Sequence, residues 1–209
     1  MLFCADGYRY GGTIHDSLGK AARLREAIPA IQRLVVVPFV ESAAPHPPGS
    51  VTWEAFLAGG SASSPGGSAS GDGTPDGSAP EPQFPHFPFD QPLFILYSSG
   101  TTGAPKCIVH GAGGTLLKHH VEHKFHTDLR REDVLFYFTT CGWMMWNWLV
   151  SGLAQGCTLV LYDGSPAHPG PDRLLELAQQ TGITVLGTRP KFLASVQKAN
   201  LVPKGAFPL

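Results

Sequence analysis

The sequence predicts an α/β fold in which a largely parallel sheet packs against flanking helices. Short runs of apolar, often β-branched residues recur at 34–39, 134–138 and 183–186. Buried parallel strands have this composition because both of their faces are covered. Stretches with helical spacing of apolar residues separate most of the runs, which is typical of parallel strands joined by crossover helices. We therefore expect ligands at the ends of strands.

The first segment, residues 1–58, is predicted to be one α/β piece. A helix should begin at Asp16 or Ser17, because both have side chains that cap helices. A buried strand should follow at 34–39, and a short helix at 52–57. The side chains expected on the inner face of the first helix are Leu18, Ala21, Leu24 and Ile28.

The second segment, residues 59–90, changes composition abruptly. From Gly59 to Pro82 it contains no aromatic and no branched aliphatic residue. Such a stretch cannot bury enough apolar surface to offset its ordering entropy, so we expect a disordered insert. The prolines that follow predict an extended linker at 84–89.

The third segment, residues 91–209, holds the remaining elements. Strands are expected at 93–96, 107–110, 134–138, 157–162 and 183–186, and those at 93–96 and 134–138 should be buried. Helices are expected at 112–126, 143–153, 171–182 and 191–198. In the helix at 171–182, Leu174, Leu175 and Ala178 should face inward, with Gly182 ending the helix. On the helix at 112–126, one face carries Leu116, Leu117, Val121 and Phe125.

Composition and net charge exclude some classes of binding partner. The formal net charge is -1 and no basic block occurs, so we expect neither nucleic acid nor a membrane surface as a partner. No apolar run approaches the ~20 residues that span a bilayer, and the N-terminus lacks the features of a signal peptide. The four cysteines are widely spaced without a Cys-x-x-Cys pair, so buried free thiols and a cytosolic location are expected.

The stretch 97–106 carries the chemistry. Two glycines, four hydroxyl side chains and Lys106 lie between two predicted strands. Glycine lets backbone N–H groups approach a ligand, hydroxyls donate to anionic oxygens, and lysine adds positive charge. This combination suits a polyphosphate, although a plain polar hairpin loop has the same residue types. It is not a Walker A loop, because a strand follows where a helix should.

Residues 97–110 resemble the phosphate-binding signature of the adenylate-forming acyl-CoA synthetases. That signature is an aromatic residue, Ser or Thr, Ser-Gly-Thr-Thr-Gly, any residue, Pro-Lys, and a short apolar strand ending in His; this sequence matches it at every defined position. The resemblance implies that Lys106 is catalytic and neutralises charge on the pyrophosphate leaving group. It implies that the β- and γ-phosphates of ATP are held by Ser98, Ser99, Gly100, Thr101, Thr102 and Gly103.

A second, looser motif is similar to the family's carboxylate site. It consists of the strand at 134–138 followed by residues 139–143, and it implies that Trp143 contacts the acyl group. The alternative is that this Trp- and Met-rich stretch simply packs in the core. Residues 142–148, 160–166 and 113–116 resemble the acetoacetate-activating members in particular. The implied reaction joins acetoacetate to ATP as an acyl-adenylate, with pyrophosphate released, and coenzyme A then displaces AMP.

The chain departs from the family in three respects, the first of which is the low-complexity segment from Gly59 to Pro82, which looks like an insertion. Arg189 and Pro190 stand where relatives usually carry small residues before a lysine. The family's Tyr-Gly-x-Thr-Glu motif, ribose-binding Asp, hinge and C-terminal Lys have no counterpart, so the Mg²⁺ ligands are not expected within this chain. We therefore expect an incomplete piece of the large N-terminal domain of an adenylate-forming enzyme, inactive in isolation. The alternatives are a non-catalytic fragment that binds nucleotide weakly or makes protein contacts only, and an unrelated α/β binding domain.

A pair of histidines is the last candidate site in the sequence. His119 and His123 are four residues apart and share a helix face, as metal ligands can. No glutamate stands in the metalloprotease position and no third ligand is identifiable. We expect a solvated helix face and no metal.

Overall fold

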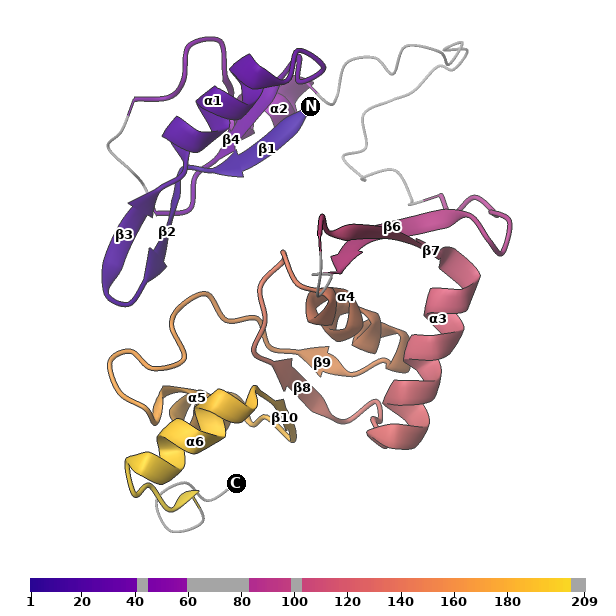
Figure 1. Cartoon of the computed structure of the whole chain (residues 1–209), viewed down its shortest axis with the longest axis vertical. Helices are drawn as coiled ribbons and strands as arrows, with labels where there is room; N and C mark the ends of the chain where they lie inside the picture. The colour runs from indigo at the N-terminus through magenta and orange to yellow at the C-terminus, as the bar shows by residue number, and fades with distance from the viewer. Residues whose placement is uncertain (41–44, 60–82, 99–102, 204–209) are drawn as a thin grey trace, which may run out of the picture. The chain divides into compact units, whose positions relative to one another are not determined.

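The computed structural model describes residues 1–40, 45–59, 83–98 and 103–203, and they fall into two compact units. The first unit comprises the described residues of Met1–Glu81 with Asp163–Ser165, and the second comprises those that remain. Each unit combines helices with a three-stranded parallel sheet, so the predicted α/β class is confirmed (Figure 1). Residues 60–82 of the predicted insert and residues 99–102 of the glycine-rich stretch lie outside the described residues.

The first unit is built on a parallel sheet with strand order β1-β4-β5. Its three strands are β1 (Leu2–Ala5), β4 (Leu34–Val37) and β5 (Val51–Thr52). An antiparallel hairpin of β2 (Gly7–Tyr10) and β3 (Thr13–Asp16) precedes α1 (Leu18–Ala27), and α2 (Trp53–Gly59) follows β5. Both predicted helices of this segment and the predicted buried strand are therefore present.

The start of α1 shows which capping residue acts. The Asp16 carboxylate accepts hydrogen bonds from the backbone N–H groups of Leu18 at 3.0 Å and Gly19 at 3.1 Å. Leu18 and Ala21 pack against the sheet, but Leu24 and Ile28 are 48% and 43% exposed. The predicted inward face is therefore wrong in its second half, because the sheet covers only the beginning of the helix.

The second unit has a parallel sheet with strand order β10-β8-β9, covered on both faces. Its strands are β8 (Val134–Tyr137), β9 (Thr158–Leu159) and β10 (Val185–Gly187). On one face Phe136 packs with α5 (Arg173–Thr181) and α6 (Pro190–Lys198). On the other, Leu135 packs with Leu149 of α4 (Met144–Ser151), which continues into the short 3₁₀ helix η2 (Gly152–Gln155).

Helix α5 agrees with its sequence pattern. Leu174, Leu175 and Ala178 are buried, and the helix ends at Gly182, whose φ of +67° is left-handed. The strand expected at 157–162 is shorter than predicted, since only Thr158 and Leu159 pair with β8.

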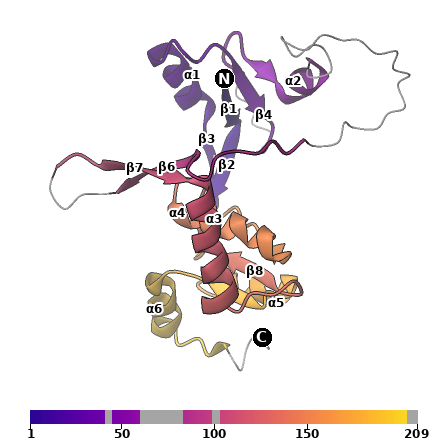
Figure 2. The ribbon, with the colours of Figure 1, turned by 90° about the vertical axis from the view of Figure 1, so that its right-hand side faces the viewer.

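The remaining part of this unit is a hairpin followed by a long helix. Strands β6 (Pro92–Ser98) and β7 (Lys106–Gly111) are antiparallel. Strand β7 leads directly into α3 (Ala112–Val121), which continues as a π-helical turn, η1 (Glu122–His126) (Figure 2). The strand predicted at 93–96 is present as β6, but its predicted burial is wrong, because Leu93 and Ile95 are 51% and 58% exposed. The apolar face of α3 is exposed as well: its members are Leu116, Leu117, Val121 and Phe125.

The thiols differ from expectation in the same way. Cys157 is buried and Cys4 is half-buried, but Cys107 and Cys141 are exposed, so the prediction of buried thiols is wrong for these two. Both lie on or beside surfaces that no described segment covers. Across the described ranges, no helix is both long enough and apolar enough to cross a membrane.

Candidate functional site

The hairpin positions two candidate phosphate-binding side chains. The register of β6 and β7 pairs Ser98 with Lys106, the last and first residues of the two strands. Directly opposed residues of an antiparallel pair project on the same face, with Cβ atoms roughly 5 Å apart. The hydroxyl and the ammonium group therefore start from the same face at the mouth of the loop.

Gly103 lies within the described end of that loop. Its φ of +100° is in the region that side chains with a Cβ rarely adopt, and a Cβ built there meets nothing within 4 Å. Glycine is therefore favoured at this position by the backbone conformation and not by a lack of space for a side chain. The four other candidate loop residues, Ser99, Gly100, Thr101 and Thr102, lie outside the described residues.

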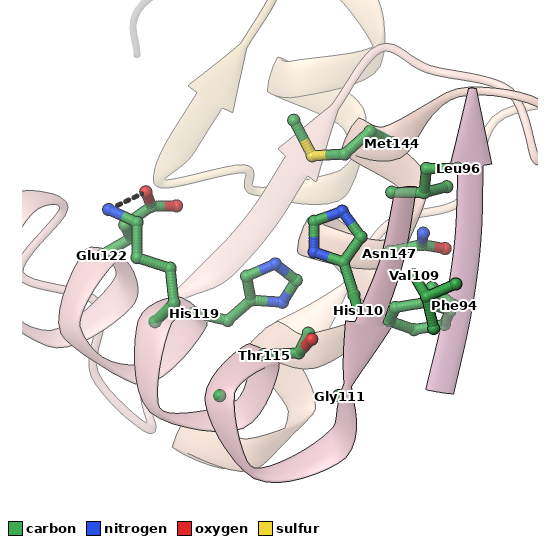
Figure 3. A pocket seen from close by; sticks show the side chains of 12 residues that line it. Phe94, Leu96, Val109, His110, Gly111, Thr115, His119, Glu122, Met144 and Asn147 are labelled. Carbon is green, nitrogen blue, oxygen red and sulfur yellow. Dashed lines mark ion pairs between the residues drawn. The ribbon is translucent and has the colours of Figure 1, made fainter. Parts of the chain in front are cut away.

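A cavity of about 410 Å³ lies between the hairpin, α3 and α4 (Figure 3). The hairpin supplies an apolar wall that includes Phe94 and Leu96. Polar groups face the same space from the end of β7 and from α3, namely His110, Thr115 and His119. At the rim, Lys118 and Glu122 form an ion pair with 2.7 Å between Nζ and Oε1.

Two polar atoms at this cavity lack partners. Neither Thr115 Oγ1 nor His119 Nδ1 is hydrogen-bonded within the part of the chain that the structure describes, although both atoms are buried. Burial lowers the pKa of His119, since desolvation penalises the imidazolium. The imidazole is therefore neutral near pH 7 and can accept or donate one hydrogen bond. A polar ligand or an ordered water would satisfy these atoms.

His123 is a structural residue. It has no exposed surface, and its Nε2 lies 2.9 Å from the Trp148 carbonyl oxygen and 3.0 Å from Ser151 Oγ. Because a carbonyl only accepts, Nε2 carries the proton and donates it. The prediction of a solvated face is therefore wrong for His123 and for His119, which lines the cavity. Among the described residues no group of three possible metal ligands occurs.

Trp143 lies beside a smaller cavity of about 240 Å³, together with Tyr137, Thr139 and Arg189. Its indole is 59% exposed, and the Arg189 guanidinium carbon lies 5.0 Å from the ring centroid. Trp143 and Arg189 are the N-cap residues of α4 and α6. Strands β8 and β10 end shortly before them and are paired at Tyr137 and Gly187, so both side chains start from the carboxyl-end edge of the parallel sheet.

Sequence reasoning did not find this pairing. Arg189 was notable only as a bulky residue in place of a small one, and 46 residues separate it from Trp143. No local pattern links them, because the contact depends on β10 lying next to β8. The four-residue spacing of His119 and His123 singled out His119 in the sequence. That spacing did not predict which face of α3 is buried.

Comparisons with known proteins define the class. The family model for AMP-binding enzymes matches residues 16–207, so this chain belongs to the AMP-binding enzyme family. It is 44% identical over 207 residues to an acetoacetyl-CoA synthetase of Gallus gallus, covering 97% of this chain. It is also 44% identical over 206 residues to acetoacetyl-coenzyme A synthetase of Rhizobium meliloti, again covering 97%.

A solved structure agrees with these relatives. The acetoacetyl-CoA synthetase from Streptomyces lividans superposes with a TM-score of 0.82 at 39% identity, and the match covers all of this chain and 29% of that one. The chain likewise spans 29% of the length of the Gallus gallus and Rhizobium meliloti proteins. The fold described above is thus a piece of the adenylate-forming fold, as predicted.

Proposed function

We propose that this chain takes part in the ATP-dependent activation of acetoacetate to acetoacetyl-CoA. In this proposal a carboxylate oxygen of acetoacetate attacks the α-phosphorus of ATP, which yields the acyl-adenylate and pyrophosphate. The thiol of coenzyme A then attacks the acyl carbon and displaces AMP. The names and the identity of the relatives support the choice of reaction.

The observation that carries the proposal is the hairpin mouth, where Ser98 is paired with Lys106. A hydroxyl donor and a cation on one face fit the oxygens of a polyphosphate. We assign Lys106 to the charge that develops on the pyrophosphate leaving group. The β- and γ-phosphates are assigned to Ser98, Ser99, Gly100, Thr101, Thr102 and Gly103, and the acyl group to Trp143.

Magnesium would neutralise phosphate charge during the displacement. The proposal assigns it no ligand among the described residues, which hold no cluster of three suitable side chains. What these residues supply is positioning and fixed donors, which lower the barrier by orienting the reactants and stabilising charge. We place the activity in the cytosol, a reducing compartment in which exposed thiols such as Cys107 and Cys141 stay free.

The test uses a chimera in which this chain replaces the matching segment of the Streptomyces lividans synthetase. We expect acetoacetate-dependent exchange of label between pyrophosphate and ATP. Lys106→Ala should slow that exchange by roughly 30- to 100-fold, because a charge-assisted contact in the transition state contributes about 2–3 kcal/mol. Acetoacetate binding should change little, since Lys106 is assigned to the phosphates.

Lys124→Ala is the matched control, because Lys124 is an exposed lysine of the same unit that lies in η1 and lines neither cavity described above. It should leave exchange unchanged. An unaltered exchange rate in the Lys106→Ala chimera would exclude the role given to Lys106. A chimera that exchanges label only with other acids would exclude acetoacetate as the substrate.

A further inference from the structure

The contact between Arg189 and Trp143 has a feature that packing alone does not explain. The guanidinium lies 5.0 Å from the centroid of an indole ring, and its charge has no carboxylate partner in the described ranges. A guanidinium stacked on a ring keeps the N–H donors of its edge available. Arg189 is exposed, and it therefore brings N–H donors that no described carboxylate occupies to the edge of the sheet.

Arg189 lines a cavity whose size suits a short acyl chain. The cavity measures about 240 Å³, enough for roughly eight water-sized volumes of ~30 Å³ each. Its other walls are the rings of Tyr137 and Trp143, the side chains of two methionines, Met144 and Met145, and Thr139. In a largely aromatic and thioether lining, a single cation favours a ligand that carries an oxygen acceptor.

This cavity shares lining residues with a neighbouring cavity that reaches the mouth of the loop. Trp143 and Met144 also line a second cavity, of about 510 Å³, together with Tyr97. Tyr97 directly precedes Ser98, at the mouth of the loop. An acid lying along Trp143 can thus direct its reacting carboxylate towards the loop and its far end towards Arg189.

We propose that Arg189 is a specificity-determining residue that donates a hydrogen bond to a second oxygen acceptor on the acyl substrate. The site then selects short acids with an oxo or carboxylate group at the far end over plain alkyl acids of the same length. This inference rests on the proposed function, because it describes the acyl end of the same site. A site built to donate to a substrate oxygen rejects an analogue that lacks it, since its polar group is left unpaired.

The experiment compares acetoacetate with butyrate, which has the same chain length without the oxo group. Binding of each acid to the 209-residue chain is measured by calorimetry without ATP, and kcat/KM for each is measured in the chimera. In the unaltered protein acetoacetate should bind more tightly. Arg189→Met should weaken acetoacetate binding roughly 10- to 100-fold, the usual effect of losing a hydrogen bond to a charged group. Butyrate binding should stay within about twofold.

Arg189→Lys separates charge from geometry: it should restore part of the preference, because an ammonium group donates to the same oxygen without the fixed edge. Arg173→Met is the matched control. The Arg173 guanidinium also lies over a ring, 5.6 Å from the centroid of Tyr162, but Arg173 does not line the 240 Å³ cavity. This variant should leave the preference unchanged.

The outcomes separate the two proposals. Equal weakening of both acids by Arg189→Met would show that Arg189 only shapes the cavity, and equal binding of both acids to the unaltered chain would also overturn the inference. Loss of label exchange with every acid in the chimera contradicts the proposed reaction instead. In that case the calorimetric preference still decides whether Arg189 reads an oxygen acceptor.

Discussion

Strand β8 and strand β6 of the hairpin have a similar apolar composition but opposite environments. Both are short runs of apolar residues, and both were expected to be buried. In β8, Leu135 and Phe136 are 0% and 1% exposed, because α4 covers one face and α5 and α6 cover the other. In β6, Ile95 is 58% exposed. Apolar composition therefore identifies a strand, while burial depends on the segments available to cover it.

The two regions also supply different side chains to the candidate sites. The β8 sheet supplies a rigid edge from which Trp143 and Arg189 project, and the hairpin supplies Ser98 and Lys106. The three cavities described above lie along the hairpin and at the sheet edge. Rigid packing is thus concentrated in β8 and its helices, and candidate ligand contacts lie at the margin of that core.

The largest difference between the two regions should be in stability. Phe136→Ala removes a side chain from the centre of the core, so it should lower the free energy of unfolding by about 3–5 kcal/mol. Ile95→Ala, the matched truncation in β6, should cost under about 1 kcal/mol, because its side chain is already more than half exposed. Urea unfolding monitored by tryptophan fluorescence measures both. Similar losses for the two variants would mean that β6 is covered in solution.

Two glycines give an intermediate effect. A Cβ on Gly152 would lie 2.8 Å from Leu135 Cδ2, next to the buried face of β8. Gly152→Ala should therefore destabilise the chain by about 1–3 kcal/mol through overpacking. In α3, a Cβ on Gly114 meets nothing within 4 Å. Gly114→Ala should stabilise by roughly 0.5–1 kcal/mol, because alanine favours the helix. Thermal unfolding compares the two, and a stabilising Gly152→Ala would contradict the packing.

The free energy of unfolding should depend on pH through His123, which packs against α4. Burial lowers the pKa of His123 below 6.5, so the folded state binds fewer protons than the unfolded state. Stability contributed by neutral His123 is complete above pH 6.5, and it is lost as the pH falls below that value towards the folded-state pKa. Urea unfolding at pH 7.5 and 5.5 should show this loss. Buried His119 acts in the same direction.

His123→Phe tests the assignment. It should reduce the difference between the two pH values, because phenylalanine does not titrate. The Trp148 carbonyl remains satisfied in this variant, since Ser151 Oγ donates to it at 2.7 Å. The exposed His126 provides the control, and His126→Gln should retain the loss at low pH. An unchanged pH dependence in His123→Phe would assign the effect to another group.

The smallest effect on folding should come from the exposed face of α3. Leu117 and Phe125 are 58% and 74% exposed, so Leu117→Glu and Phe125→Glu should each change the free energy of unfolding by no more than about 0.5 kcal/mol. Exposed apolar side chains promote association. Light scattering should therefore show less self-association in both variants. A large loss of stability would show that this face packs within the chain.

Several features followed from the sequence alone. The α/β class, the buried strand β8 and the glycine that ends α5 depend on local composition, helical period and backbone freedom, which act between near neighbours. The candidate phosphate-binding stretch was recognisable because the family signature lies within fourteen consecutive positions, 97–110. Family membership followed from that stretch, and the comparisons confirm it.

Only the tertiary structure decided which surfaces are covered and which distant residues meet. The periodic pattern of α3 placed Leu116 and Leu117 on one apolar face, yet the buried side chain is His123, because α4 packs on the histidine face through Trp148. The pairing of β10 with β8 brings Arg189 to Trp143 across 46 residues of sequence. Such contacts depend on the order of strands and the docking of helices, which arise from the summed packing of the whole unit and leave no local trace in the residues that meet.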